Sequence, residues 1–124
     1  MKSPIVLLVI EEPKVLETYA SWLRSRGYQI RMCSTPAEGI NFIETEEVSV
    51  VIVSQGTSAF EGRRVLERSL QLHPKVPVLI IARVLDMRCY LEAMDLGAMD
   101  YLEKPEPQNM AWIIDTQMRR VGAA

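Results

Sequence analysis

The chain has 124 residues, of which 48% are hydrophobic and 24% are charged. A length of about 100–150 residues is typical of one compact domain, so we expect a single domain over 1–124, and the composition excludes disordered, collagen-like and membrane-embedded chains. With 14 basic and 16 acidic side chains, the net charge is −2, which gives no overall positive field for phosphates, and we expect no direct binding to nucleic acid.

The apolar runs and the cysteines narrow the class further. The longest apolar runs, 5–10 and 48–53, are too short to span a bilayer, and no leader with a charged and then an apolar region opens the chain. We therefore expect a cytoplasmic protein. Cys33 and Cys89 form no CxxC pair and have no neighbouring histidine, which argues against zinc or redox chemistry. We expect both to be buried as small apolar side chains.

Apolar runs of strand length alternate along the chain with segments of helical period. Proline or a capping residue opens most of the expected helices, and Gly27 and Gly97 close two of them. In chain order we expect strands at 4–10, 28–33, 48–53, 76–82 and 99–102, and helices at 13–26, 36–45, 62–73, 87–96 and from 107 onward. Thr35 and Asp86 are the expected capping residues of the second and fourth helices.

Five strands that alternate with five helices predict a doubly wound (βα)5 sandwich of three layers, because right-handed crossovers place helices on both faces of a parallel sheet. In such a sheet the ligand site lies beyond the carboxyl ends of the strands. A phosphate-binding loop is not expected there, since Glu11, Glu12 and Pro13 follow the first strand instead of glycines. We expect His73, at the end of the third helix, to be solvated and not catalytic.

Four segments carry a resemblance that covers nearly the whole chain: VLLVIEEP, VVIVSQGTSAFEG, PVLIIAR and, most specifically, GAMDYLEKP. Together they resemble the receiver domain of two-component response regulators. The resemblance implies a flavodoxin-like sheet of order 2-1-3-4-5 and, in active members, transfer of a phosphoryl group from a histidine kinase to an aspartate. It also implies protein partners, namely a histidine kinase, an output domain or another regulator.

Three positions of the family's site have lost their function in this chain. The first strand of a receiver ends in two acidic residues, and the ungapped match places Ile10 and Glu11 there, followed by Glu12. The acceptor aspartate, eight positions before a glycine, falls on Ser54. The hydroxyl residue that ends the fourth strand falls on Ala82. The resemblance therefore points to a degenerate receiver, or pseudo-receiver, without its acceptor.

The retained positions are Lys104, followed by Pro105, and Tyr101, which matches the aromatic switch position. We expect Lys104 to pair with Glu11 or Glu12 or else to reach solvent, with pairing favoured. Tyr101 is expected to be a core aromatic with a hydrated hydroxyl. For Arg83 a solvated loop position is favoured over a bound anion or a salt bridge to Glu11.

The remaining donors are a poor set for magnesium. In the family, two carboxylates, a backbone carbonyl and waters hold Mg²⁺, as the ion's preference for oxygen ligands requires. Here Glu11 supplies one carboxylate, Gly56 the carbonyl and Ser54 only a neutral hydroxyl. We expect no cofactor and no tight metal site, which leaves weak binding through Glu11 open.

The favoured function is signalling by protein contact without phosphoryl chemistry, and without enzymatic activity. The alternative is a phosphotransfer-competent receiver that uses Ser54, Glu11 or Glu12 as a non-standard acceptor. A third hypothesis is a structural role within a larger regulator.

A homodimer is the last expectation. In receivers the face of the fourth helix, fifth strand and fifth helix mediates dimerisation. Here Asp100 is expected to reach Arg119 or Arg120 of a second copy. Leu91, Met94 and Trp112 would supply apolar contact, against the alternative of a solvated face. The sequence also favours core positions for five methionines: Met87, Met94, Met99, Met110 and Met118.

Overall fold

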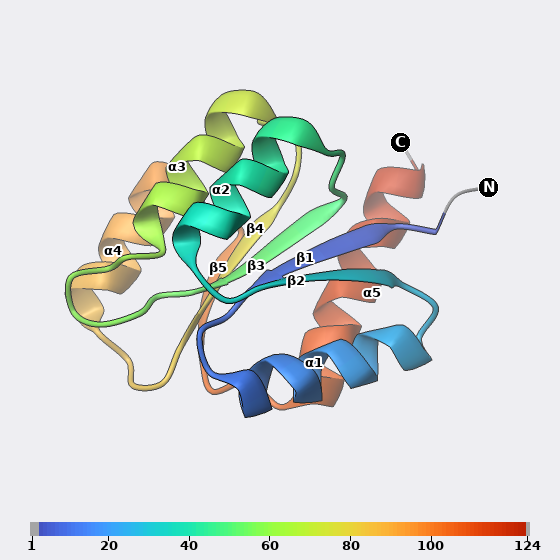
Figure 1. The fold of residues 1–124 in the computed structure, drawn as a ribbon, viewed down its shortest axis with the longest axis horizontal. Coiled ribbons are helices and arrows are strands. Elements are labelled where there is room, and N and C mark those ends of the chain that lie inside the picture. Colours follow the sequence, from blue (N-terminus) through green and yellow to red (C-terminus); the bar gives the residue numbers. More distant parts are fainter. Residues whose placement is uncertain (1–2, 124) are drawn as a thin grey trace.

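Strands and helices alternate through the computed structural model, which describes residues 3–123 (Figure 1). The strands are β1 (Ile5–Val9), β2 (Gln29–Cys33), β3 (Val50–Ser54), β4 (Val78–Ala82) and β5 (Asp100–Glu103). The helices are α1 (Pro13–Ser25), α2 (Pro36–Thr45), α3 (Arg63–Leu72), α4 (Met87–Leu96) and α5 (Pro107–Ala123). None of these helices is long and apolar enough, within the described residues, to cross a membrane.

The five strands form one parallel sheet of order β2-β1-β3-β4-β5, which confirms the predicted fold class. All five strands begin one or two residues later than predicted, and the shift is two residues for β3 and β4, whose predicted first residues lie in the segments that lead into the sheet. Val76 donates its N–H to the His73 carbonyl at 3.0 Å, and Ser49 donates to the Ile5 carbonyl at 2.8 Å. β3 therefore begins at Val50 and includes Ser54, which places that residue at the carboxyl edge of the sheet.

Two apolar clusters, one on each face of the sheet, form the core. Alternate residues of one strand serve different clusters, since successive side chains of a strand point to opposite faces. Leu7 packs with buried residues of α2, α3 and α4, whereas Leu8 packs with those of α1 and α5. Figure 1 shows the same division, with α1 and α5 on one side of the sheet and the other three helices opposite.

The predicted caps of α2 and α4 are confirmed. The Thr35 hydroxyl accepts a hydrogen bond from the Glu38 N–H at 3.2 Å, and the Asp86 carboxylate accepts from the Cys89 N–H at 3.2 Å. Gly97 ends α4 with φ 113°, a conformation that a side chain would strain. The beginning of α4, beside the site described below, is therefore fixed by its own sequence.

The prediction that all five methionines belong to the core is wrong for two of them. Met110 is fully buried, and Met99 and Met118 pack against the same cluster, but Met87 is 57% exposed and Met94 is 36% exposed. The reason is that α4 buries a narrow face, Cys89 and Ala93, so residues at helical spacing on its other side meet solvent.

The expectations for the cysteines and the histidine had different outcomes. Cys33 and Cys89 are both buried and free, as predicted. His73 is not a freely solvated side chain, because its Nε2 lies 3.0 Å from the Ile43 carbonyl oxygen and ties the end of α3 to α2. It takes no part in the cleft described below.

The hydroxyl of Ser69, inside α3, is buried without a hydrogen-bond partner among the described residues. Such a group loses its water without compensation, so Ser69→Ala should raise the free energy of unfolding by about 1 kcal/mol. Urea denaturation measures the change. The matched control is Ser21→Ala, which replaces an exposed serine of α1. Its free energy of unfolding should rise by only a few tenths of a kcal/mol, the gain that helix propensity gives. A loss of stability in Ser69→Ala would contradict the prediction.

Candidate functional site

An open cleft of about 930 Å³ lies at the carboxyl ends of the strands, between the loops that follow β1, β3, β4 and β5. It brings together most of the positions that the sequence singled out: Ile10, Glu11, Glu12, Ser54, Gly56, Ala82, Arg83, Lys104 and Pro105. Tyr101 does not line this cleft and lies behind it, in the core under α4.

The floor of the cleft is apolar. Ile10 is 1% exposed and packs in the core cluster with α1 and α5, and its N–H donates to the Cys33 carbonyl at 3.0 Å. Ile81 and Ala82, at the end of β4, are also buried. The receiver resemblance implies a carboxylate at position 10 and a hydroxyl at position 82, and Ile10 and Ala82 supply neither.

Ser54 stands at the centre of the edge, half-buried, as the last residue of β3. The loop after it turns back sharply, because the Gly62 N–H donates to the Gln55 carbonyl at 3.1 Å. A Cβ atom at Gly62 would lie 2.1 Å from the Ser54 carbonyl oxygen, so glycine is required there. This close approach explains why a glycine stands eight positions after Ser54.

Glu61 closes the same loop on itself. Its carboxylate accepts hydrogen bonds from the Thr57 N–H at 2.7 Å and from the Thr57 hydroxyl at 2.8 Å. These bonds hold the pKa of the Glu61 carboxyl below its usual value, and the bond from the Thr57 hydroxyl has the largest effect. Glu61 is thus committed to the loop and is not a base for chemistry in the cleft.

The charged side chains of the cleft pair differently from the prediction. Arg83 is 79% exposed, which agrees with the favoured solvated position, and its Nε lies 3.2 Å from Glu12 Oε1, so the pair that it forms is with Glu12 and not with Glu11. Lys104 forms no ion pair within residues 3–119, and the favoured pairing with Glu11 or Glu12 is wrong. Arg83 occupies the Glu12 carboxylate. Lys104 is fixed through its backbone instead, with φ 37° and its N–H on the Ala82 carbonyl at 2.8 Å.

The family's magnesium ion does not fit these donors. Glu12 is held by Arg83, Ser54 offers a neutral hydroxyl, and the position before Glu11 is a buried isoleucine. No group of three or more acidic, cysteine or histidine side chains within the described residues is arranged to hold a metal ion. A hard dication needs more negative oxygen ligands than Glu11 and the Gly56 carbonyl supply.

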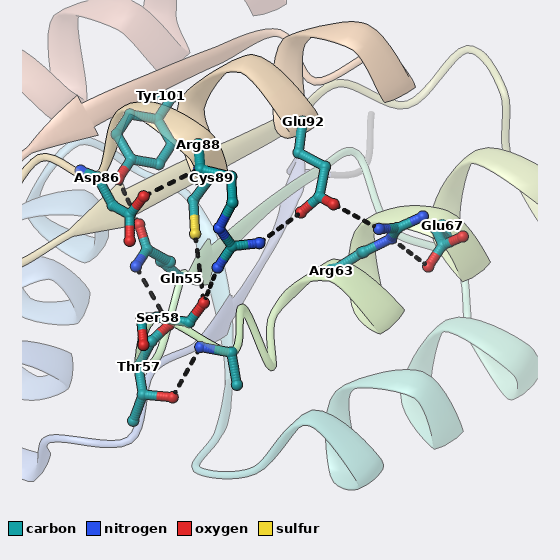
Figure 2. A network of polar contacts seen from close by, with 11 residues as sticks. Gln55, Thr57, Ser58, Arg63, Glu67, Asp86, Arg88, Cys89, Glu92 and Tyr101 are labelled. Atoms are coloured by element: carbon teal, nitrogen blue, oxygen red, sulfur yellow. Dashed lines mark hydrogen bonds and ion pairs between the residues drawn. The ribbon is translucent and has the colours of Figure 1, made fainter.

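Tyr101 is buried in the core, as predicted, and its hydroxyl is bonded to two protein groups. It donates a hydrogen bond to the side-chain oxygen of Gln55 and accepts one from the Asp86 N–H at 3.1 Å (Figure 2). Burial, the largest influence, raises the pKa of Tyr101 above its ordinary 10.0, so the hydroxyl keeps the proton that it donates. The ring of Tyr101 also packs edge to face against the ring of Tyr90, with the two ring centroids 5.6 Å apart.

Gln55 is the buried residue of the cleft that the sequence interpretation missed. It follows Ser54 directly and is 5% exposed, and its side-chain amide donates to the Thr57 carbonyl at 3.2 Å while its oxygen accepts from Tyr101. A polar loop of SQGTS predicts solvated side chains. The available signal was its place one residue after a central strand, where a side chain points between the neighbouring loops.

Further polar contacts connect the same loop to α4 (Figure 2). The Arg88 guanidinium donates to the Ser58 carbonyl, and the buried Cys89 thiol lies 3.9 Å from the same oxygen. Arg63 Nη1 bonds Glu92 at 2.7 Å and so joins α3 to α4. The loop after β3, the start of α4 and the Tyr101 side chain are therefore one connected unit.

The proposed dimer residues are only partly available. Asp100 is half-buried, and its carboxylate accepts a hydrogen bond from the neighbouring Tyr101 N–H at 2.8 Å. Arg119 is exposed on α5, and the Arg120 side chain lies outside the described residues. The two tryptophans are both on the α1 and α5 side, Trp22 44% exposed and Trp112 63% exposed.

Comparison with known proteins identifies relatives over most of the chain. Residues 6–115 match the family described as response regulator receiver domain. The transcriptional regulatory protein KdpE of Mycobacterium tuberculosis is 32% identical over 101 residues, which are 82% of this chain and 44% of that protein. A response regulator described as NtrX-like, from Rickettsia typhi, is 30% identical over 103 residues, 81% of this chain and 22% of the relative. The chain thus spans less than half the length of these curated relatives.

Solved structures agree with this fold. A CheY-like receiver domain protein from Methanospirillum hungatei superposes with a TM-score of 0.87 at 22% identity, over 96% of this chain and 99% of that one. At this identity the likeness concerns the fold alone, namely the five-stranded parallel sheet and its flanking helices.

Proposed function

Because the chain belongs to the response regulator receiver domain family, we propose that it is a degenerate receiver, which signals in a two-component system through protein contacts and accepts no phosphoryl group. Receiver domains are signalling modules rather than enzymes, and we propose no catalytic role for this one. The cytoplasmic location expected from the sequence is part of the same proposal.

The observation that carries the proposal is Ser54 at the end of β3. A serine hydroxyl is a weak nucleophile unless a neighbouring base activates it. Ser54 Oγ has no hydrogen-bond partner among the described residues, and the adjacent carboxylates are either exposed, as in Glu11, or paired, as in Glu12. Neither an acceptor carboxylate nor an activated hydroxyl stands where the phosphoryl group would arrive.

Tyr101 supports a signalling state that does not depend on phosphorylation. Its hydroxyl is already satisfied inside the protein by Gln55 and by the Asp86 N–H, and the two bonds join β5, the loop after β3 and the start of α4. Removing Tyr101 from this position would leave a buried amide oxygen without its donor, which costs about 1–3 kcal/mol. The position of this side chain is therefore set by the sequence and needs no phosphoryl group.

The partners that we propose are proteins: a histidine kinase, an output domain or another regulator. A second copy is a further proposed partner, through the face of α4, β5 and α5. Asp100 is less suited to that contact than the sequence suggested, because its carboxylate already bonds the Tyr101 N–H. Charge pairs on this face must therefore come from α4 or from Arg119.

Incubation with acetyl phosphate and millimolar Mg²⁺ tests the proposal. We expect an unchanged intact mass, unchanged amide resonances at the cleft and no rise in melting temperature with Mg²⁺, since a ligand that binds only the folded state must stabilise it.

A stoichiometric phosphoryl adduct would overturn the proposal and favour the alternative of a non-standard acceptor. Ser54→Ala is the matched variant in that case. Loss of the adduct would identify Ser54, whereas its persistence would direct the mapping to Glu11 and Glu12.

A further inference from the structure

Apolar side chains from several elements line the cleft at the carboxyl ends of the strands. In the loop after β4, Val84 is 70% exposed and Leu85 is 49% exposed, and both line the cleft. Three half-buried residues of α1, of the segment after β5 and of the first turn of α5 line it as well: Val15, Pro105 and Pro107. Scattered exposed apolar side chains are ordinary, whereas a group of them at a concave site indicates a ligand pocket.

The floor of this cleft carries no charge. It is formed by the buried residues Ile10, Ile81 and Ala82. A carboxylate at position 10, which the receiver resemblance implies, would hold water there and oppose an apolar ligand, because a charge loses free energy when it is desolvated. Ile10 removes that opposition. The cleft, of about 930 Å³, is also within the range of roughly 300–1,000 Å³ that small-molecule sites occupy.

Two hydrogen-bond donors of the cleft are unpaired. Within residues 3–119 the Ser54 hydroxyl forms no hydrogen bond and the Lys104 ammonium forms no ion pair. Ser54 ends β3 and Lys104 follows β5, so the two groups come from the two strands that flank β4 in the sheet. A carboxylate accepts hydrogen bonds from a hydroxyl and from an ammonium, and the charged bond is the stronger of the two.

The acidic side chains of the cleft do not prevent the binding of an anion. Those that line it are Glu11, Glu12, Asp86 and Glu106. Arg83 neutralises Glu12, and Asp86 caps the first turn of α4 (Figure 2). Glu11 and Glu106 are exposed, so water and salt weaken their repulsion of a bound anion, and the exposed Lys14 adds a second cation to the lining.

We propose that the cleft binds a small organic monocarboxylate with an apolar body, and that it does so without a metal ion. The body contacts Val84, Leu85 and the uncharged floor, and the carboxylate accepts hydrogen bonds from Lys104 and Ser54. The inference goes beyond the proposed function, which concerns protein contacts, because it gives the degenerate cleft a ligand of its own. An inorganic anion would gain only the polar contacts.

Titration with 1-naphthoate in the presence of EDTA, followed through amide resonances, tests the inference. We expect saturable shifts at Ser54, Val84 and Lys104, with a dissociation constant of about 1 mM or tighter. Acetate and inorganic phosphate should bind at least about tenfold more weakly, because neither buries an apolar body. Octanoate replaces the ring by a chain, and the tighter of octanoate and 1-naphthoate shows which shape of body the cleft prefers.

Two ligands with the same ring test the carboxylate. Neutral 1-naphthalenemethanol should bind about tenfold more weakly than 1-naphthoate, and the ammonium of 1-naphthylmethylamine should bind more weakly still. Lys104→Gln should remove the preference for 1-naphthoate and leave the binding of the alcohol unchanged. Lys75→Gln, which replaces an exposed lysine outside the cleft, is the control and should change the binding of neither ligand.

The double variant Val84→Asn and Leu85→Gln tests the apolar contact without adding charge. Both side chains are well exposed, so the fold should be kept. The dissociation constants of 1-naphthoate and of the alcohol should both rise about tenfold, since both ligands lose the same apolar contact. Leu91→Gln is the matched control, because Leu91 is 58% exposed and does not line the cleft, and it should leave both constants unchanged.

Four results would overturn the inference: a dissociation constant for 1-naphthoate weaker than about 1 mM, binding that requires added Mg²⁺, an ammonium ligand that binds as tightly as the carboxylate, or a double variant that binds 1-naphthoate as tightly as the natural chain. None of them bears on phosphorylation, which the acetyl phosphate experiment tests separately through the intact mass.

Discussion

The triple variant Ile10→Asp, Ser54→Asp and Ala82→Thr is expected to bind Mg²⁺ and to accept one phosphoryl group from acetyl phosphate. The changes would set two carboxylates beside Glu11 and the Gly56 carbonyl, which is the oxygen-rich donor set that a hard dication requires. They also place a hydroxyl at the end of β4, next to Lys104. The measurements are the melting temperature against Mg²⁺ concentration, where a saturable rise reports binding, and the intact mass.

The matched control is the triple variant Ile10→Asp, Ser54→Asn and Ala82→Thr, which has an uncharged amide at the acceptor position. It should remain unphosphorylated. The triple variant will be less stable than the natural chain, by about 2–3 kcal/mol, since Ile10 is buried in the core. A folded triple variant that binds no Mg²⁺ would mean that the loops, with Arg83 on Glu12, have moved away from a metal-binding geometry.

Gly62→Ala is expected to lower the free energy of unfolding by about 3 kcal/mol, because the new Cβ would lie 2.1 Å from the Ser54 carbonyl oxygen. Neither backbone can yield easily. The Gly62 N–H is bonded to Gln55, and its carbonyl accepts from Leu66 at 3.2 Å. Urea denaturation gives the free energy, and amide resonances of Ser54 and Gln55 should shift with it.

Gly27→Ala separates a close approach from backbone strain. Gly27 has φ 93°, yet no atom lies within 4 Å of an added Cβ, so this change carries only the cost of the left-handed conformation, about 1 kcal/mol. A loss in Gly62→Ala no larger than that in Gly27→Ala would contradict the steric explanation.

The order of elements followed from the sequence because each signal was local. Proline at the start of α1, the Thr35 and Asp86 caps, and Gly97 act within a few residues of where they stand. The starts of β3 and β4 were placed two residues early, because Val48 and Val76 have high strand propensity. Propensity does not contain the bond from Ser49 to the distant Ile5 carbonyl or the turn that the Val76 N–H closes on the His73 carbonyl.

The cleft was predictable in place but not in its pairing. That the strand ends converge follows from the parallel sheet, so Ile10, Ser54 and Ala82 were expected together. Which cation would occupy Glu12 was not, since Arg83 and Lys104 both follow strands at this edge, and side-chain reach decides between them. The burial of Gln55 could not be predicted from the sequence either, because its stabilising partner, Tyr101, is distant in sequence.

The placement of the two tryptophans determines what intrinsic fluorescence can report. Indole emission depends on contact with water, and Trp22 and Trp112 are both well exposed on the α1 and α5 side of the sheet, whereas α4 packs on the opposite face. Pairing through α4 should therefore leave the emission spectrum unchanged, whereas a dimer that covers Trp112 on α5 would shift it to shorter wavelength. A concentration series in an ordinary fluorimeter thus separates the two modes of self-association without a label.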